Sequence, residues 1–171
     1  EQKQVNEVLL VSGICHSEIN VEGPTEKPDE LQKFTVIRKL DSQTALPPGL
    51  KNSGNSAHIE TVENEYGLLN YLVAKLHQID ADIIVGHNFL SYDLDVLLHR
   101  MNDMKIQMWS KLGRLYREKR PKLQAGAGGL NESTWEEKQI VSGRLVCDTY
   151  LAAKEYLREK SYSLKSLAAS Q

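Results

Sequence analysis

The sequence predicts an α/β domain in which a mixed sheet is flanked by helices. Three observations support this class: two strand-like apolar runs near the start, apolar residues at helical spacing in the middle, and short apolar runs that alternate with the helices. With 171 residues the chain can bury a core, and we expect a single domain over residues 1–171. A formal net charge of -2 argues against a basic coat over the whole surface, although a local basic patch remains possible.

The first two elements are expected to be strands that pair with each other. Residues 8–15 hold an apolar run typical of a buried strand, and residues 34–37 form a second run that we expect to be antiparallel to it. Residues 22–30 contain Gly23 and two prolines, which predicts a surface loop or a long hairpin turn. Prolines and glycines between residues 46 and 56 indicate another irregular stretch.

Helical spacing follows, and it predicts a helix that ends at residues 80–82. Its apolar face is made of Leu68, Leu69, Leu72, Val73, Leu76 and Ile79. The next run, residues 83–85, is short and wholly apolar and stops at Gly86. This pattern is typical of a strand that is covered on both faces.

A turn at residues 88–91 leads into a second predicted helix. Ser91 is its predicted N-cap, and the carboxylates of Asp93 and Asp95 suit the positive end of the helix dipole. The apolar face of this helix is made of Leu94, Leu97, Leu98, Met101 and Met104.

A basic segment interrupts the alternation, and we expect a hairpin or loop insertion over about residues 109–142. Within it, residues 111–122 contain one acid, Glu118, and six cations, Lys111, Arg114, Arg117, Lys119, Arg120 and Lys122. Such a run attracts phosphate backbones, and the rings of Trp109 and Tyr116 are suited to stacking on an unpaired base. These eight cationic and aromatic residues are our predicted DNA contacts. The alternative is that they form the solvated face of a helix or hairpin.

Residues 144–148 are predicted to form a further strand, residues 151–160 a helix, and residues 163–169 the beginning of another helix. The order is then two strands, a helix, a strand, a helix, the basic insertion, a strand and two helices. This order is compatible with a ribonuclease H-like nuclease fold and with several other α/β folds.

One stretch of the chain carries residues suited to chemistry. The strand before Gly86 delivers Asn88 to a sheet end, and Asp93 opens the next helix with Tyr92 beside it. A partly shielded carboxylate there is an oxygen ligand of the kind that Mg²⁺ prefers, and the Asn88 amide can tie the turn. The same residues also fit a structural role, in which Asp93 stabilises the helix start and Tyr92 belongs to the core. We expect His87 to be hydrogen-bonded at the strand end.

Asn88, Tyr92 and Asp93 resemble the second exonuclease motif of B-family DNA polymerases, in which the acid helps bind the metal ions of the 3′–5′ proofreading site. The resemblance covers the chain from about Asn6 onward and is closest to the polymerase alpha group of that family. It is carried by residues 86–88, 109–115, 120–123, 143–148, 153–155 and 160–164. It implies a ribonuclease H-like, exonuclease-type domain that is incomplete at both ends.

The resemblance also implies that the chain catalyses nothing by itself. In the family, a first motif with Asp-x-Glu and a third motif with Tyr and Asp complete the site, and we expect both to fall outside residues 1–171. Hydrolysis with two metal ions needs several converging carboxylates. We therefore expect no catalytic residue, no cofactor in this chain, and a vestigial motif in Asn88, Tyr92 and Asp93. Asp93 becomes a metal ligand only if the site is live.

For the parent protein, the resemblance implies a DNA-directed DNA polymerase, a nucleotidyltransferase that uses Mg²⁺ to extend RNA–DNA primers in the nucleus. The expected partners are the DNA template–primer and the primase and regulatory subunits. The sequence shows no signal peptide and no membrane span. Two alternatives stay open: an active proofreading exonuclease completed by residues outside the chain, and a protein-interaction module without nucleotide chemistry.

Overall fold

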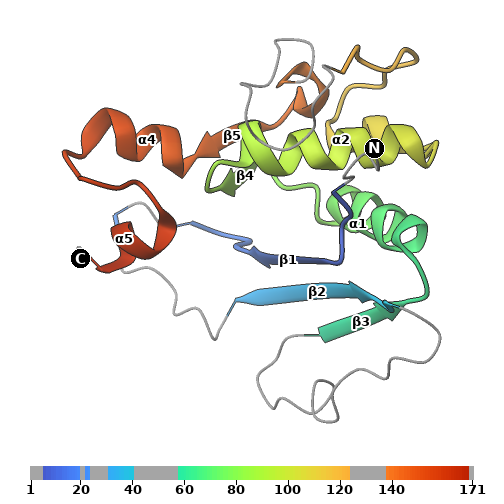
Figure 1. Ribbon diagram of the computed structural model, residues 1–171, viewed down its shortest axis with the longest axis horizontal. Coiled ribbons are helices and arrows are strands. Elements are labelled where there is room, and N and C mark those ends of the chain that lie inside the picture. Colours follow the sequence, from blue (N-terminus) through green and yellow to red (C-terminus); the bar gives the residue numbers. More distant parts are fainter. Residues whose placement is uncertain (1–5, 20–21, 24–30, 41–57, 124–137, 170–171) are drawn as a thin grey trace, which may run out of the picture. The chain divides into compact units, whose positions relative to one another are not determined.

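The computed structural model describes residues 6–19, 22–23, 31–40, 58–123 and 138–169 (Figure 1). The chain divides into two compact units. One unit is Glu7–Ile79, and the other is Glu1–Asn6 together with Asp80–Gln171. Within these units the described residues form a mixed α/β arrangement of strands and helices, as the sequence predicts. The expectation of one domain over residues 1–171 stays a prediction.

The unit Glu7–Ile79 is built on a three-stranded mixed sheet in the order β1-β2-β3. Strand β1 (Leu10–Cys15) is antiparallel to β2 (Gln32–Arg38), which confirms the predicted pairing of the first two strands. Strand β3 (His58–Val62) is parallel to β2 and was not predicted from the sequence. The loop or hairpin turn predicted over residues 22–30 lies outside the described residues except for 22–23, and the irregular stretch predicted between residues 46 and 56 lies wholly outside them.

Helix α1 (Glu65–Ile79) contacts the strands of this sheet and supplies most of the core of the unit. It begins where the Asn64 side chain accepts a hydrogen bond from the Gly67 amide (2.8 Å), the usual N-cap arrangement. The predicted apolar face is confirmed by its buried members Leu68, Leu69, Leu72 and Val73. Phe34 and Val36 of β2 are buried as well.

The second unit contains a two-stranded parallel sheet. Strand β4 (Ile83–Gly86) pairs with β5 (Leu145–Asp148), and Gly86 lies opposite Asp148 where both strands end. Both strands were predicted, but the expectation that β4 is covered on both faces is wrong. Ile83 is 46% exposed and Val85 is 63% exposed. An apolar run in the sequence shows only that the side chains of a strand are apolar. How many faces of the strand are covered depends on which elements pack against the sheet.

Helical segments follow each of these strands. After β4, the π-helical turn η1 (Phe89–Asp93) runs directly into α2 (Leu94–Asp103), and β5 runs into α4 (Thr149–Tyr156). The predicted N-cap at Ser91 is wrong, because Ser91 lies inside η1 and the helical backbone already includes it. The helix predicted over residues 151–160 starts and ends earlier, as α4, and α5 (Leu164–Ala169) follows it.

In the described part of the basic insertion lie the short 3₁₀ helices η2 (Trp109–Leu112) and η3 (Gln139–Val141). Residues 113–123 between them have no regular helix or strand, and residues 124–137, including the glycine-rich stretch, lie outside the described residues. The apolar side chains buried in this unit are Leu94, Leu98, Met101, Ile106, Trp109, Leu112, Ile140, Val141 and Ala153. The core therefore extends from α2 into the insertion, and the insertion is anchored by it.

Candidate functional site

The first candidate site lies where the parallel strands β4 and β5 end together. The carboxyl ends of parallel strands are common ligand sites, because the loops that follow them converge at one edge of the sheet. Here the converging residues come from the turn after β4 and from the start of α4. We call His87, Asn88, Asp93, Asp148 and Thr149 the strand-end cluster.

Asp148 holds this cluster together. It is only 7% exposed, and its carboxylate accepts hydrogen bonds from the backbone amides of Asn88 (2.9 Å), Leu90 (3.1 Å) and Tyr150 (3.0 Å). The Tyr150 bond makes Asp148 the N-cap of α4, and the other two bonds tie the turn after β4. Most of the hydrogen-bonding capacity of this carboxylate is therefore directed at the backbone.

Asn88 contributes through its backbone. Its φ of 60° places it in the left-handed region, which asparagine tolerates better than most residues. Its side chain makes no cap hydrogen bond, so the turn is tied by the Asn88 amide and Asp148, and the side-chain amide does not perform the task we expected of it.

His87 connects the strand end to the segment after α4, as its predicted hydrogen-bonded role requires. Nδ1 lies 3.1 Å from Oγ1 of Thr149, and Nε2 lies 3.0 Å from the carbonyl oxygen of Tyr162. Because a carbonyl oxygen only accepts, Nε2 must carry a hydrogen. The ring also meets the Tyr150 ring edge-on at 5.6 Å between centroids. These contacts dock the segment around Tyr162 onto the end of β4.

Asp93 is placed as the sequence predicts, directly before α2. The residue as a whole is exposed, and Tyr92 beside it is 47% exposed, so Tyr92 is not a core residue. Partial removal from water raises the pKa of the Asp93 carboxyl above its usual value, and the negative charge of Asp148 raises it further. Asp93 therefore holds its charge less readily than an isolated aspartate.

The arrangement offers little to a pair of metal ions. Among the described residues, no group of three or more His, Cys, Asp or Glu side chains is placed to hold a metal ion. Asp148 is the acid whose charge acts on Asp93, and it is engaged with three backbone amides. Within the described ranges, Asp93 and the side-chain amide of Asn88 are thus the members of the cluster left to contact an external ligand.

The second candidate site is the basic insertion, and we call residues 113–123 the arginine-pinned loop. Arg114 donates to Asp80 Oδ1 (2.9 Å) and to the Asp80 carbonyl (2.7 Å), and it forms an ion pair with Asp82 Oδ1 (2.8 Å). Bonding to Arg114 lowers the pKa of Asp80 below its usual value, and the charges of Arg114 and Arg144 act in the same direction. Arg114 is therefore engaged within the chain.

Arg120 and Arg117 are engaged within the chain as well. Arg120 donates to the carbonyl oxygens of Met101 (3.0 Å) and Ile106 (2.6 Å), and its guanidinium lies 5.6 Å from the centre of the Trp109 ring. Arg117 donates to Oε1 of Gln139 (3.0 Å). Trp109 itself is 5% exposed and belongs to the core.

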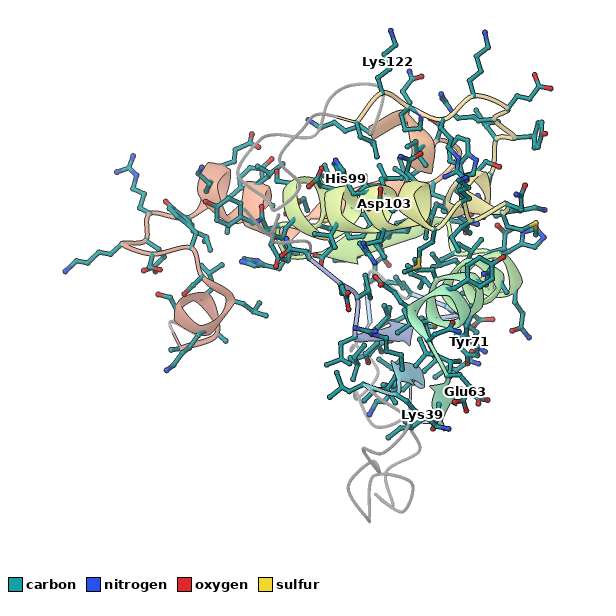
Figure 2. The ribbon with its side chains drawn as sticks, turned by 45° about the vertical axis from the view of Figure 1, so that its right-hand side comes forward. Lys39, Glu63, Tyr71, His99, Asp103 and Lys122 are labelled. Atoms are coloured by element: carbon teal, nitrogen blue, oxygen red, sulfur yellow. The ribbon has the colours of Figure 1, made fainter. Side chains whose placement is uncertain are left out.

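The remaining predicted contacts lie at the surface or near it. Tyr116 is 81% exposed, Lys119 and Lys122 are exposed, and Lys111 is half-buried. Figure 2 shows Lys122 pointing away from the ribbon. These positions describe where the side chains lie, and contact with DNA stays a prediction for all eight residues.

Sequence reasoning missed three residues that organise both sites. Asp148 was treated only as the end of a strand, although an acid directly before a helix is an N-cap signal. Arg144 has a side chain that is 1% exposed, and it donates to the carbonyls of Leu112 and Ala81 and pairs with Asp80 (3.0 Å). No local pattern marks Arg144 or Asp80, because their partners are distant in sequence.

Comparison with known proteins identifies the family. Residues 2–167 match the family described as "DNA polymerase family B, exonuclease domain". The chain therefore belongs to the exonuclease domains of family B DNA polymerases. The descriptions of its relatives are narrower than that class.

Several relatives carry the description "DNA polymerase alpha catalytic subunit". That of Arabidopsis thaliana is 37% identical over 185 residues, covering 100% of this chain and 12% of the relative. Those of Xenopus laevis and Mus musculus are 37% and 33% identical, covering 95% and 97% of this chain and 11% of each relative. The chain thus spans about an eighth of these relatives or slightly less, and its homologues are polymerase alpha catalytic subunits. Among the helices that the structure describes, none has the length and apolarity that a bilayer span requires.

Proposed function

We propose that this chain is a catalytically silent, DNA-contacting exonuclease domain with a ribonuclease H-like fold, in a replicative DNA polymerase of the alpha type. The parent protein would be a DNA-directed DNA polymerase that uses Mg²⁺ to extend RNA–DNA primers in the nucleus. Its partners would be the template–primer, a primase and a regulatory subunit. The relatives support this proposal by their descriptions, and the match covers nearly the whole chain.

The engagement of Asp148 is the observation that supports silence. Phosphodiester hydrolysis by two metal ions needs several carboxylates that converge on both ions. Asp148 is the second acid of the strand-end cluster, but its carboxylate oxygens accept hydrogen bonds from three backbone amides. Moving it to a metal ion would leave those amides unpaired and would release the turn that carries Asp93.

One observation favours an active 3′–5′ exonuclease as the second candidate. Asp93 follows the carboxyl end of a strand in a parallel pair, where catalytic ligands often lie, and the residue as a whole is exposed although its carboxyl is partly removed from water. Acids from outside this chain would then have to complete the site.

An excision assay distinguishes the two. The full-length protein is given a 5′-labelled primer with a mismatched 3′ nucleotide, with Mg²⁺ or Mn²⁺ and without deoxynucleotides. We expect no shortened product beyond that given by the matched Asp93→Asn variant. Excision by the wild type that disappears in Asp93→Asn would establish the active candidate and overturn silence.

A further inference from the structure

The arginine-pinned loop is tied to its neighbours by close packing and hydrogen bonds although it has no regular secondary structure. Gly113 packs so closely that a Cβ at this position would lie 2.2 Å from the carbonyl oxygen of Ile140. The Arg114 amide donates to the carbonyl of Ser142 (2.9 Å), and its side chain donates to Gly143 (3.2 Å). The start of the loop is therefore fixed against the segment that follows η3.

The middle and the end of the loop are fixed by side chains. Arg117 reaches Gln139, and Arg120 reaches two backbone carbonyls and covers the buried ring of Trp109. A guanidinium can satisfy several carbonyl oxygens at once because its donors form a planar fork. Three arginines at intervals of three residues therefore hold the loop from within.

While these arginines bond within the chain, a different set of side chains is exposed. Leu115 is 55% exposed and Tyr116 is 81% exposed, directly after the first arginine. Lys119 and Lys122 are exposed on either side of Arg120, and Figure 2 shows Lys122 extended away from the loop. The loop thus presents one aromatic ring and two ammonium groups on a fixed backbone.

We propose that the arginine-pinned loop binds single-stranded nucleic acid, with the Tyr116 ring stacked on one unpaired base and with Lys119 and Lys122 neutralising adjacent phosphates. This inference rests on the proposed DNA-contacting function and deepens it. Proteins that bind unpaired strands without reading their sequence commonly combine aromatic rings with cations. The few outward cations do not favour duplex binding, which relies on many phosphate contacts.

The composition of the outward set also favours nucleic acid over a protein partner. The cores of protein interfaces are depleted in lysine, whereas this ring has two lysines close to it in sequence. A stacked base needs only the face of one ring, and Tyr116 offers such a face with most of its surface exposed.

The first test measures affinity with matched variants of the full-length protein. Fluorescein-labelled oligo-dT and an abasic oligomer of equal length are titrated, with anisotropy as the readout. We expect Tyr116→Ala to weaken binding to oligo-dT about fivefold or more, while Tyr116→Phe stays within twofold of the wild type. Leu115→Ala is the control for the neighbouring exposed side chain. The abasic oligomer should bind the wild type and Tyr116→Ala equally.

The lysines are tested through salt. Each neutralised phosphate on a single strand changes the slope of log affinity against log salt by about 0.7. Lys119→Gln should therefore make the slope shallower by about that amount on both oligomers. An unchanged slope would remove Lys119 from the proposed contact.

The second test locates the contact. It also distinguishes a failure of this inference from a failure of the proposed DNA-contacting function. Oligomers carrying 5-iododeoxyuridine are photo-crosslinked to the full-length protein and the attached peptide is identified by mass spectrometry. A crosslink at Tyr116 supports the inference. Crosslinks only at other residues of this chain overturn the inference but leave the domain in contact with DNA. No crosslink within this chain overturns both. Lower unfolding temperature in Tyr116→Ala with unchanged DNA affinity would show that the ring packs against protein instead.

Discussion

In both the strand-end cluster and the arginine-pinned loop, charged side chains form hydrogen bonds with the backbone. The side chain is an aspartate in the cluster, and the side chains are arginines in the loop. In the cluster, the acid Asp148 accepts hydrogen bonds from three backbone amides. In the loop, Arg120 donates to two backbone carbonyls, and Arg114 donates to two more. Each region thus uses some of its charged side chains to fix the backbone, while other residues are exposed, namely Asp93 in the cluster and Tyr116, Lys119 and Lys122 in the loop. A charged residue near a predicted site is therefore not necessarily available to a ligand.

The comparison is tested most strongly at Asp148. We expect Asp148→Ala to lower the free energy of unfolding by about 3–5 kcal/mol, because buried amides of the turn and of α4 lose their acceptor. Denaturant unfolding followed by tryptophan fluorescence gives the value. Asp148→Asn keeps one acceptor oxygen and should cost about half as much.

The control is Glu155→Ala on the exposed face of α4, which should stay within about 0.5 kcal/mol of the wild type. If Asp148→Ala costs no more than this control, the carboxylate does not hold the turn and the comparison fails on its acidic side.

A cation outside the loop, Arg144, fixes the backbone in the same way, and its side chain is 1% exposed. We expect Arg144→Ala to cost about 2–4 kcal/mol, because the carbonyls of Leu112 and Ala81 lose their donor. Arg144→Lys should recover only part of this, because one ammonium cannot reproduce the guanidinium fork. Lys119→Ala, at an exposed position, is the matched control, and an equal loss in both variants would contradict the prediction.

A smaller effect is expected at His87, which docks the segment around Tyr162. His87→Ala should make this docking about 1–2 kcal/mol less favourable, since two hydrogen bonds are lost. Trypsin cleavage after the exposed residues Arg158 and Lys160 should become about 5- to 30-fold faster in consequence. Thr149→Val removes the Oγ1 contacts with His87 and with the Gly86 carbonyl but keeps the His87–Tyr162 bond, and it should give an intermediate rate. Cleavage at the wild-type rate in His87→Ala would show that other contacts hold the segment.

The smallest expected effect is on the pH dependence of stability, which should have opposite signs for Asp93 and Asp80. The folded state raises the pKa of Asp93, so the protein loses stability as pH rises through the interval from the usual aspartate pKa to the raised value. Above that interval Asp93→Asn should be more stable than the wild type, by less than about 1 kcal/mol because the residue is exposed and solvent screens it. Below the usual aspartate pKa the advantage should vanish.

Asp80 should behave in the opposite way. Arg114 lowers its pKa, so its contribution is present above the usual aspartate pKa and is lost as pH falls through the lowered value. Urea midpoints of Asp80→Asn and Asp93→Asn, recorded from acid to neutral pH, should therefore diverge from the wild type in opposite directions. Parallel curves would contradict both assignments.

Helices and strands could be predicted where the pattern of apolar residues lies within one short stretch of sequence. The apolar face of α1 from Leu68 to Val73 and the pairing of β1 with β2 follow from residue types alone. Strand β3 could not be found in this way, because it is five residues long, contains Glu60, and is defined by its parallel pairing with β2. Such pairing is a long-range contact that no short window of sequence contains.

In the candidate sites, too, features set by residues adjacent in sequence could be predicted, whereas features set by distant residues could not. Asp93 was located correctly because strand, turn and helix are consecutive. The partners of Asp148 lie about 60 residues away in Asn88 and Leu90, and those of Arg114 lie 34 residues away at Asp80. The count of cations in the basic run was correct, but the direction in which each one points is decided by these distant groups.

The pinning of residues 113–123 has a consequence for the rate of any encounter at this loop. A flexible loop loses conformational entropy when a partner orders it, and this loss weakens binding. Here intramolecular hydrogen bonds have already restricted the backbone, so little of that loss remains for the bound state. Association at this loop can then proceed without waiting for a rearrangement of its backbone.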